Sequence, residues 1–182
     1  MARCIAWRSA SLALGALLLG PVGAALAQAP GGIGGPPRDH AAAAPAPADS
    51  LRISGAVQRP RALDVQALEA LPAITLKTDA GAWSGVDLWT LLASEGGLQL
   101  PATPRSAALA HYVLVTGSDG YRALFALAEL DPAFGARPVL LAYRLDGAPL
   151  GRSGMARIVA PGDGKRGRSV ANVVSIQVLA AP

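Results

Sequence analysis

Cysteine is almost absent from this chain, with Cys4 as the single example among 182 residues. Because Cys4 precedes an apolar N-terminal stretch, the sequence beyond that stretch has no thiol, no disulfide and no thiolate ligand for a metal. Histidine is nearly as scarce, since the chain has only His40 and His111. A zinc site takes about four ligands, three of them usually His or Cys, so the composition argues against one and leaves only an all-oxygen cation site open.

The groups that hydrolases use are also scarce. A serine triad would have His111 as its base, and we expect His111 instead to be a hydrogen-bonded or exposed strand residue. The segment GSDG at 117–120 is one residue short of a nucleophile elbow. Glu129 and Asp131 stand two positions apart and face apart on a helix, which predicts capping or surface charges. We therefore predict no catalytic residue and no metal ligand.

Aromatic residues make up 4% of the chain and the formal net charge is only +4. Proteins that bind nucleic acid usually present a basic face interleaved with aromatic side chains. Neither feature is present, so nucleic acid is not an expected partner.

The N-terminal residues 1–27 have the pattern of a secretory signal peptide. Arg3 and Arg8 precede the apolar run SLALGALLLGPVGAALA, which ends in the small residues Ala25 and Ala27. A membrane anchor is the alternative, but Gly and Pro interrupt the run, which is short for a span. We expect cleavage before Gln28, no membrane span after removal of the signal, and a periplasmic or secreted protein.

Two further segments follow the signal. Residues 28–48 are nearly all Ala, Pro and Gly, and such a composition predicts a flexible linker, with His40 exposed to solvent. Residues 49–182 are enough for one domain with its own core.

The patterns within residues 49–182 predict mainly strands. The turn Ser118-Asp119-Gly120 joins two of them into a hairpin. Asp64 and Asp87 are positioned to cap short helices at 64–71 and 88–96, and residues 127–132 predict one helical turn. The result is a β-rich α+β domain. Strands are expected at 51–57, 74–78, 111–117, 121–125, 138–145, 155–160 and 170–179.

The loop APGDGKRGRSVAN at 160–172 contains a literal G-x-G-x-x-G, formed by Gly162, Gly164 and Gly167. A dinucleotide fingerprint needs a helix after the glycines and an acidic residue about 20 positions on. A Val- and Ile-rich strand follows instead, and no acidic residue follows Asp163. We therefore interpret the loop as the turn of a late hairpin between 155–160 and 170–179.

The order of six short motifs resembles a known family. ISGAVQRP, LPAITL, WSGVDLWTLL, YVLVTGSDGYRALFALAELDP, VLLAYRLDGAPL and ARIVAPGDGKRGRSVANVVSIQV follow one another over residues 51–180. This series resembles the molybdopterin-binding domain of the sulfite-oxidase type. The resemblance implies a β-rich mixed-sheet, barrel-like α+β fold with a few short helices.

The resemblance also implies a cofactor. Family members bind a phosphate-bearing pterin whose dithiolene holds molybdenum together with one protein cysteine, which follows the strand after the LP motif. The corresponding stretch here is ITLKTDAGAW at 74–83, which has Lys77, Thr78 and Asp79 but no thiol. Oxygen ligands substitute poorly for a soft thiolate, so the cofactor of this chain stays unassigned, molybdopterin being the one that the resemblance suggests.

The family's anion contacts lie near the GSDGYRA hairpin and the late basic loop. They place the candidate ligand-binding residues of this chain at Asp119, Tyr121, Arg122, Lys165, Arg166 and Arg168. Backbone N–H groups at the loop glycines and bidentate arginines suit a small anion. The alternative from composition alone is an ordinary exposed loop, with Asp119 only making its turn.

Three functions remain open at this stage. The first is a non-catalytic exported domain that binds a small anionic ligand or a partner protein. The second is a molybdopterin-dependent oxidoreductase, or a subunit of one, with atypical metal ligation. The third is a structural or interaction module without a ligand.

Overall fold

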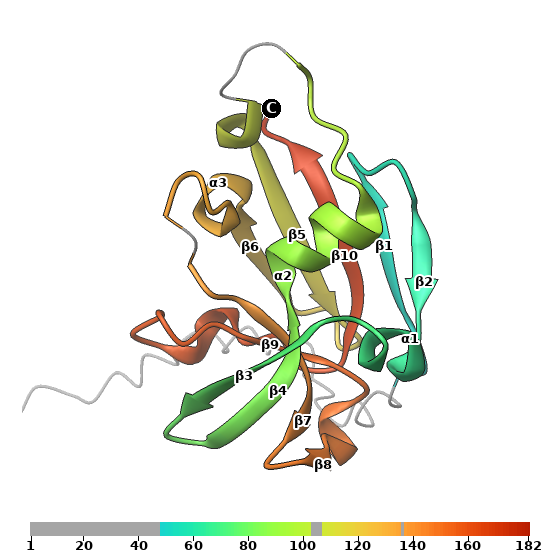
Figure 1. The fold of residues 1–182 in the computed structure, drawn as a ribbon, viewed down its shortest axis with the longest axis vertical. Helices are drawn as coiled ribbons and strands as arrows, with labels where there is room; N and C mark the ends of the chain where they lie inside the picture. Colours follow the sequence, from blue (N-terminus) through green and yellow to red (C-terminus); the bar gives the residue numbers. More distant parts are fainter. Residues whose placement is uncertain (1–47, 103–106, 136) are drawn as a thin grey trace, which may run out of the picture. The chain divides into compact units, whose positions relative to one another are not determined.

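The computed structural model describes residues 48–102, 107–135 and 137–182 (Figure 1). The predicted signal peptide and all but the last residue of the predicted linker lie outside these residues. Within them the chain is a sheet-rich α+β fold with few short helices, as predicted. The strands form two five-stranded sheets, and neither described sheet closes on itself. The barrel-like part of the prediction is therefore corrected to two open sheets.

The first sheet contains strands from both ends of the described chain. β1 pairs in parallel with β10, and every other neighbour in this sheet is antiparallel. Its strand order is β2 (Arg61–Leu63), β1 (Leu51–Gly55), β10 (Val173–Ala180), β5 (His111–Gly117) and β6 (Arg122–Ala126).

The predicted hairpin of β5 and β6 is confirmed. Val113 and Val115 alternate with half-exposed neighbours, so one face of β5 is buried and the other is not. At the turn, the Asp119 carboxylate accepts a hydrogen bond from the Tyr121 amide at 2.9 Å. Gly120 has a φ of +81°, a conformation that glycine adopts without steric cost.

The second sheet contains a hairpin formed by residues 73–78 and 81–87, of which only the first strand was predicted from the sequence. The strands at 81–87, 61–63 and 148–149 were not among those predicted from the sequence. The sheet runs β3 (Ala73–Thr78), β4 (Gly81–Asp87), β7 (Leu140–Leu145) and β8 (Ala148–Pro149), with β9 (Arg157–Val159) also paired to β7.

The helices begin at the predicted caps. The Asp64 side chain accepts from the Ala67 amide at 2.8 Å, and that of Asp87 accepts from the Thr90 amide at 3.0 Å. The helical segments are α1 (Val65–Glu69), α2 (Leu88–Thr90), the π-helical turn η1 (Leu91–Gly96), α3 (Leu127–Leu130), and the 3₁₀ turns η2 (Ala107–Ala110), η3 (Gly151–Ser153) and η4 (Arg166–Arg168). No helix among the described residues is long and apolar enough to cross a membrane.

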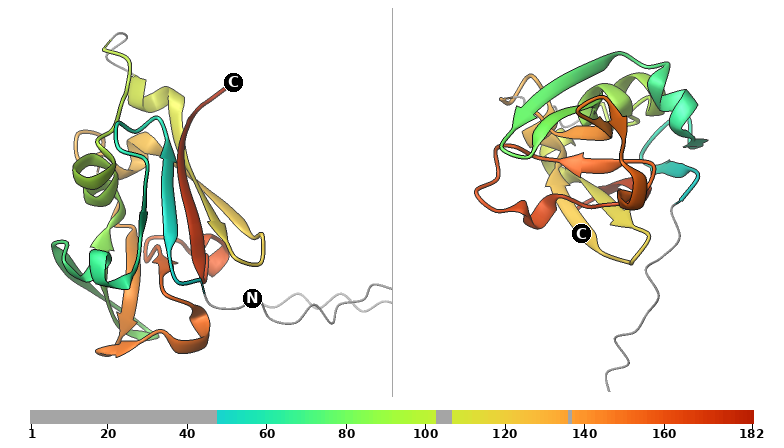
Figure 2. Two further views of the ribbon diagram at one scale, coloured as in Figure 1. Left: turned by 90° about the vertical axis from the view of Figure 1, so that its right-hand side faces the viewer. Right: turned by 90° about the horizontal axis from the view of Figure 1, so that it is seen from below.

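The main hydrophobic core lies between the first sheet and the helical segment α2–η1, which covers one face of that sheet in Figure 2. Leu88, Leu91 and Leu92 point into this core at the spacing of one helical face. Phe125 of β6 is fully buried in the same cluster. A smaller cluster around Trp83 stabilises the second sheet.

The loop between β9 and β10 crosses from one sheet to the other. β9 pairs with β7 in the second sheet, whereas β10 pairs with β1 and β5 in the first. The predicted late hairpin is confirmed only in part. Backbone hydrogen bonds join the two predicted segments, from the Ile158 amide to the Val170 carbonyl at 2.8 Å and from the Val173 amide to the Ala156 carbonyl at 3.0 Å, but β9 and β10 do not pair as strands. The prediction that a strand follows the glycine triplet is confirmed, and a 3₁₀ turn of three residues is the only helical piece between them.

Candidate anion-binding site

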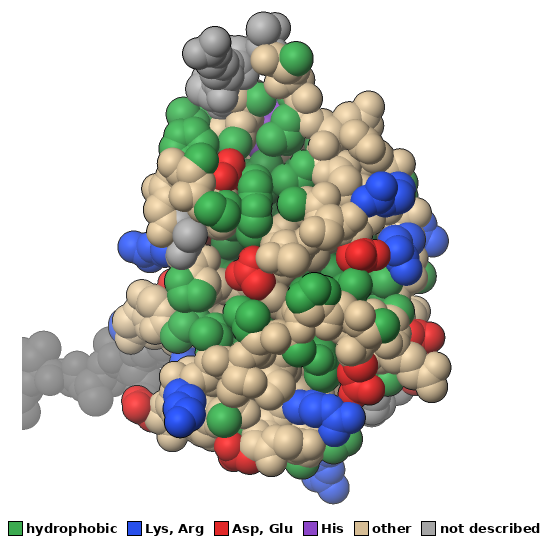
Figure 3. Space-filling model, viewed as in Figure 1, with side chains coloured by type: hydrophobic (Ala, Val, Ile, Leu, Met, Phe, Trp, Pro, Cys, Tyr) green, Lys and Arg blue, Asp and Glu red, His purple; other side chains and the backbone are tan. Residues whose placement is uncertain are grey.

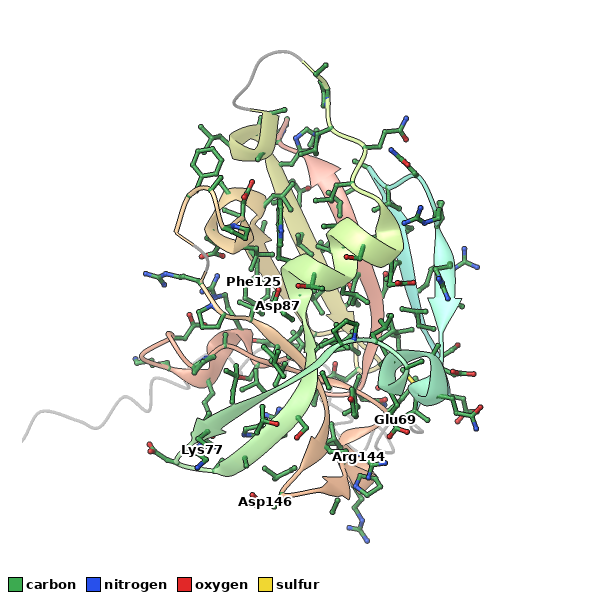
Figure 4. All side chains as sticks on the ribbon, viewed as in Figure 1. Glu69, Lys77, Asp87, Phe125, Arg144 and Asp146 are labelled. Atoms are coloured by element: carbon green, nitrogen blue, oxygen red, sulfur yellow. The ribbon has the colours of Figure 1, made fainter. Side chains whose placement is uncertain are left out.

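A cavity of about 370 Å³ opens between two turns that are far apart in the sequence. One wall is the β3–β4 turn, and the other is the β9–β10 loop. Lys77, which lies near the turn of the β3–β4 hairpin, is labelled in Figure 4. The lining residues are Lys77, Thr78, Asp79, Ala80, Trp83, Arg157, Val159, Ala160, Pro161, Asp163, Lys165, Arg166 and Ser169.

The floor of the cavity is fixed by Trp83 and Thr78. The Trp83 indole is only 8% exposed, and its Nε1–H donates to the Thr78 hydroxyl at 3.1 Å. That hydroxyl also accepts from the Ala80 amide at 3.2 Å and donates to the Gly81 carbonyl at 3.4 Å. The turn is therefore held by its own hydrogen bonds, and the indole ring has one defined orientation.

Arg157 is held against this floor. Its guanidinium carbon lies 5.8 Å from the centroid of the Trp83 ring, the distance of a cation–π contact. Because the N–H groups of a guanidinium lie in its own plane, a contact through its face leaves Arg157 able to donate two parallel hydrogen bonds to an oxyanion. Sequence reasoning did not identify Arg157, since a half-buried arginine in a short apolar strand gives no distinct pattern.

The charges on the walls are predominantly positive. Lys77, Lys165 and Arg166 line the cavity and form no ion pair with a described carboxylate. Two carboxylates, Asp79 and Asp163, also line it. In the view of Figure 3, by contrast, Lys and Arg side chains are interspersed with Asp and Glu. The cavity thus combines unpaired cations with a preorganised arginine, which suits a small anion.

The Arg168 guanidinium forms ion pairs with two carboxylates of the protein itself. Its Nε and Nη2 donate to the two Asp163 oxygens at 2.9 and 2.6 Å, and its Nη1 donates to Glu129 at 2.6 Å. The hydrogen bond from Arg168 lowers the pKa of the Asp163 carboxyl below its ordinary 3.8. The same bond, together with Glu129, raises the pKa of Arg168.

The other three residues predicted for the site lie on the β5–β6 hairpin. The Tyr121 hydroxyl donates to the Gly167 carbonyl, so this side chain fastens the hairpin to the basic loop. Asp119 makes the hairpin turn, and Arg122 is exposed on β6. None of the three lines the cavity. The structure therefore brings Lys165 and Arg166 together at the cavity, while a ligand role for the remaining four residues stays a prediction.

Several side chains that sequence analysis placed outside any active site have structural partners. His111 is half-buried, with its Nδ1 2.6 Å from the Ala107 carbonyl oxygen. Glu129 accepts from the Ala126 amide at the start of α3, so its predicted capping role is confirmed. Asp131 accepts from the Ala133 amide in the turn after α3, as an exposed turn residue rather than a helix cap. Within the described residues, no group of three His, Cys, Asp or Glu could hold a metal ion.

The Asp163–Arg168 pair predicts a pH dependence of stability. The pKa of the Asp163 carboxyl is lower in the folded protein than in the unfolded chain. The pair therefore contributes its full stabilisation at pH values above the unfolded-state pKa, and this contribution is lost as pH falls through the folded-state pKa. We expect Asp163→Asn to cost about 1.5 kcal/mol at neutral pH, the typical contribution of a hydrogen bond to a charged group. The difference from wild type in urea-unfolding free energy should shrink below about pH 4.

Phe134→Ala is the control for this pH series, because it removes an exposed side chain that does not titrate. Its difference from wild type should be the same at every pH. A difference for Asp163→Asn that is equally constant from neutral to acid pH would contradict the assignment of the pair.

The residues of the cavity do not fit a molybdenum centre held by a protein thiolate. The stretch 74–83, where the family resemblance places the cysteine, forms the β3–β4 wall. Its Thr78 hydroxyl has one proton and two lone pairs, and all three are used by Gly81, Trp83 and Ala80. Asp79 offers a hard oxygen, which is a poor match for a soft metal site. No reaction step is therefore assigned to that cofactor.

No family profile matches the chain, and no curated protein matches it at a significant level. Among solved structures, the fold is similar to that of the sulfane dehydrogenase SoxCD from Paracoccus pantotrophus, with a TM-score of 0.54 and 19% sequence identity. The similarity covers 71% of this chain and 38% of that chain, so this chain spans less than half of the protein that it matches. At this identity the similarity concerns the fold alone, and it agrees with the predicted α+β architecture.

Proposed function

We propose that this chain is an exported, non-catalytic domain that binds a small oxyanion in the cavity between the β3–β4 turn and the β9–β10 loop. The export part rests on the pattern of residues 1–27. The fold part rests on the distant similarity to a dehydrogenase subunit and on the order of the sequence motifs. The binding part rests on the cavity itself.

The observation that carries the proposal is the position of Arg157. Its guanidinium carbon lies 5.8 Å from the centroid of the buried Trp83 ring, and this cation–π contact restricts the side chain before a ligand arrives. Lys77, Lys165 and Arg166 line the same cavity without carboxylate partners among the described residues. Four cations placed around one cavity repel one another, and an anion with several oxygens relieves that repulsion while accepting their hydrogen bonds.

A binding role without catalysis follows from what surrounds the ligand position. The cavity is lined by four cations, two carboxylates, one tryptophan and small residues, with no histidine or cysteine among them. Its two carboxylates are Asp163, which is paired with Arg168, and the exposed Asp79 on the turn. General acid–base catalysis needs a titrating group held within reach of the reacting atom. Lys77, Lys165 and Asp79 can titrate, but no hydrogen bond or ion pair with a described residue holds any of these side chains in place.

Titration of the purified protein with inorganic phosphate tests the proposal, using two-dimensional NMR and thermal unfolding as readouts. We expect shifts of amide signals around the cavity and a rise in Tm with phosphate concentration, because a ligand that binds only the folded state stabilises it. Arg157→Met should weaken phosphate binding about tenfold or more, the loss expected for one charge-assisted contact.

Arg152→Met is the matched control for this experiment. Arg152 is exposed on η3 outside the cavity, so its removal lowers the net charge by the same amount without changing the site. Equal weakening by both variants would reduce the effect to general electrostatics and would overturn the proposed site. Stoichiometric molybdenum in protein purified from its native compartment would overturn the non-catalytic role.

A further inference from the structure

We infer that Arg168 is a positioning residue for this cavity: it clamps the β9–β10 loop and thereby places Lys165 and Arg166 at the ligand position. The inference rests on the proposed function. It gives Arg168 a different task from the direct ligand contact that sequence analysis predicted, because its guanidinium is engaged by the protein itself.

The clamp joins three parts of the molecule. Within the loop, Arg168 holds both oxygens of Asp163. From α3, Glu129 accepts from its Nη1, and the same nitrogen lies 3.5 Å from the Leu124 carbonyl of β6. The guanidinium carbon also lies 4.4 Å from the centroid of the Phe125 ring. A single side chain thus connects the loop to β6, to α3 and to the main core.

The donors of Arg168 are nearly all used in these contacts. A guanidinium has five N–H groups, and Nε, Nη2 and Nη1 donate to Asp163, Glu129 and the Leu124 carbonyl. One of its faces packs on Phe125. A ligand would have to displace a carboxylate to reach this side chain, whereas Lys165 and Arg166 have no such competitor among the described residues.

The position of the clamp in the sequence explains what it does to the cavity. Asp163 and Arg168 bracket Lys165 and Arg166, so their ion pair closes a short loop around the two cations. The ion pair also neutralises Asp163, which lines the cavity and would otherwise repel an anion. One contact therefore supplies both the placement of the cations and the local charge balance.

Apart from the Arg168 side chain, the loop is held by short-range backbone hydrogen bonds, from the Asp163 amide to Ala160 at 3.2 Å and from the Ser169 amide to Arg166 at 3.1 Å. A Cβ added at Gly162, Gly164 or Gly167 would meet no atom within 4 Å, so these glycines are not held by close packing. Glycine also has the widest backbone freedom of any residue. Besides the Arg168 contacts, the hydrogen bond from the Tyr121 hydroxyl to the Gly167 carbonyl fastens the segment. Without the Arg168 side chain, these local contacts remain but no ion pair ties the loop to α3, so Lys165 and Arg166 should sample a wider range of positions.

Two variants test the clamp without removing a cavity cation. Arg168→Lys keeps the positive charge but replaces a planar fork by a single ammonium, which cannot hold Asp163 and Glu129 in the same geometry. Glu129→Gln weakens the clamp from α3, outside the cavity, and keeps an oxygen for the Ala126 amide. We expect phosphate affinity to fall about tenfold in Arg168→Lys and severalfold in Glu129→Gln, measured by NMR titration well below each variant's Tm.

Arg144→Lys is the matched control. Arg144 donates from Nε and Nη2 to one oxygen of Glu69, Oε1, at 3.1 and 2.7 Å, and neither residue lines the cavity. Both residues are labelled in Figure 4. Arg144→Lys should lower Tm without changing phosphate affinity. Amide hydrogen exchange of residues 162–167 should accelerate in Arg168→Lys and not in Arg144→Lys, a readout that a general loss of stability does not reproduce.

The outcomes separate this inference from the proposed function. Phosphate binding by the wild type with unchanged affinity in both Arg168→Lys and Glu129→Gln overturns the clamp and leaves the binding site standing. Absence of phosphate binding by the wild type overturns both. If Arg168→Lys fails to fold, Glu129→Gln alone decides, because unchanged affinity in that variant contradicts the clamp.

Discussion

Replacing Phe125 by alanine should lower the free energy of unfolding by about 3–5 kcal/mol, the range seen when a buried aromatic side chain is truncated. Phe125 belongs to β6 of the first sheet, has no exposed surface and lies in the main core. The loss combines the transfer of the ring into water with the cavity left behind. Because small domains have only about 5–15 kcal/mol of stability, urea unfolding should show a large shift in midpoint.

Phe134→Ala is the control for this prediction. Phe134 is 51% exposed and belongs to neither core cluster, so its removal should change stability by less than about 0.5 kcal/mol. Similar losses in the two variants would mean that Phe125 is not packed as described. Phe125→Ala should also loosen the clamp, since the Arg168 guanidinium lies over the Phe125 ring.

Gly55→Ala should cost about 3 kcal/mol or more, through a backbone clash together with an unfavourable conformation. Gly55 ends β1 with a φ of +91°, and a Cβ there would lie 2.0 Å from the Val178 carbonyl oxygen. That oxygen accepts from the Ala56 amide at 2.8 Å, so it cannot move away without breaking a bond between the strands. Thermal and urea unfolding should both report the loss.

Gly120→Ala separates the two contributions. Gly120 has a similar φ of +81°, but a Cβ at this position meets nothing within 4 Å. Only the conformational cost of about 1–2 kcal/mol should therefore appear. Equal losses for Gly55→Ala and Gly120→Ala would show that the close approach of β1 to β10 is absent in solution.

Local features of the fold were predictable because the residues that define them are neighbours in the chain. The β5–β6 hairpin follows from strand alternation interrupted by Ser118-Asp119-Gly120, and the helix starts follow from Asp64 and Asp87. In each case the hydrogen bonds that decide the structure span only a few residues. The α+β class follows from the count of such elements.

Long-range pairing was not predictable in the same way. The strands at 155–160 and 170–179 have the composition of a hairpin and a turn-forming loop between them, yet β9 and β10 join different sheets. Which sheet each strand joins depends on which sheet has a free edge and on where the strand buries more apolar surface. Both properties depend on residues throughout the chain. The parallel pairing of β1 with β10 has the same origin.

The candidate site was predicted in part for the same physical reason. A concentration of basic residues identified Lys165 and Arg166, but composition cannot tell a free cation from a paired one. Arg168 differs from its neighbours because Glu129 lies against it across 39 positions of sequence. Arg157 and Lys77 belong to the cavity because β9 and the β3–β4 turn meet there, which only the assembled second sheet defines.

The central place of β10 in the first sheet has a consequence for the order of folding. β10 lies between β1 and β5, so neither of these strands has its inner partner until residues 173–180 have left the ribosome. The pair Arg52–Ser175 closes across nearly the whole described chain, and contacts of such separation slow folding. One edge of β1 and one edge of β5 therefore stay unpaired in the nascent chain until β10 has been synthesised.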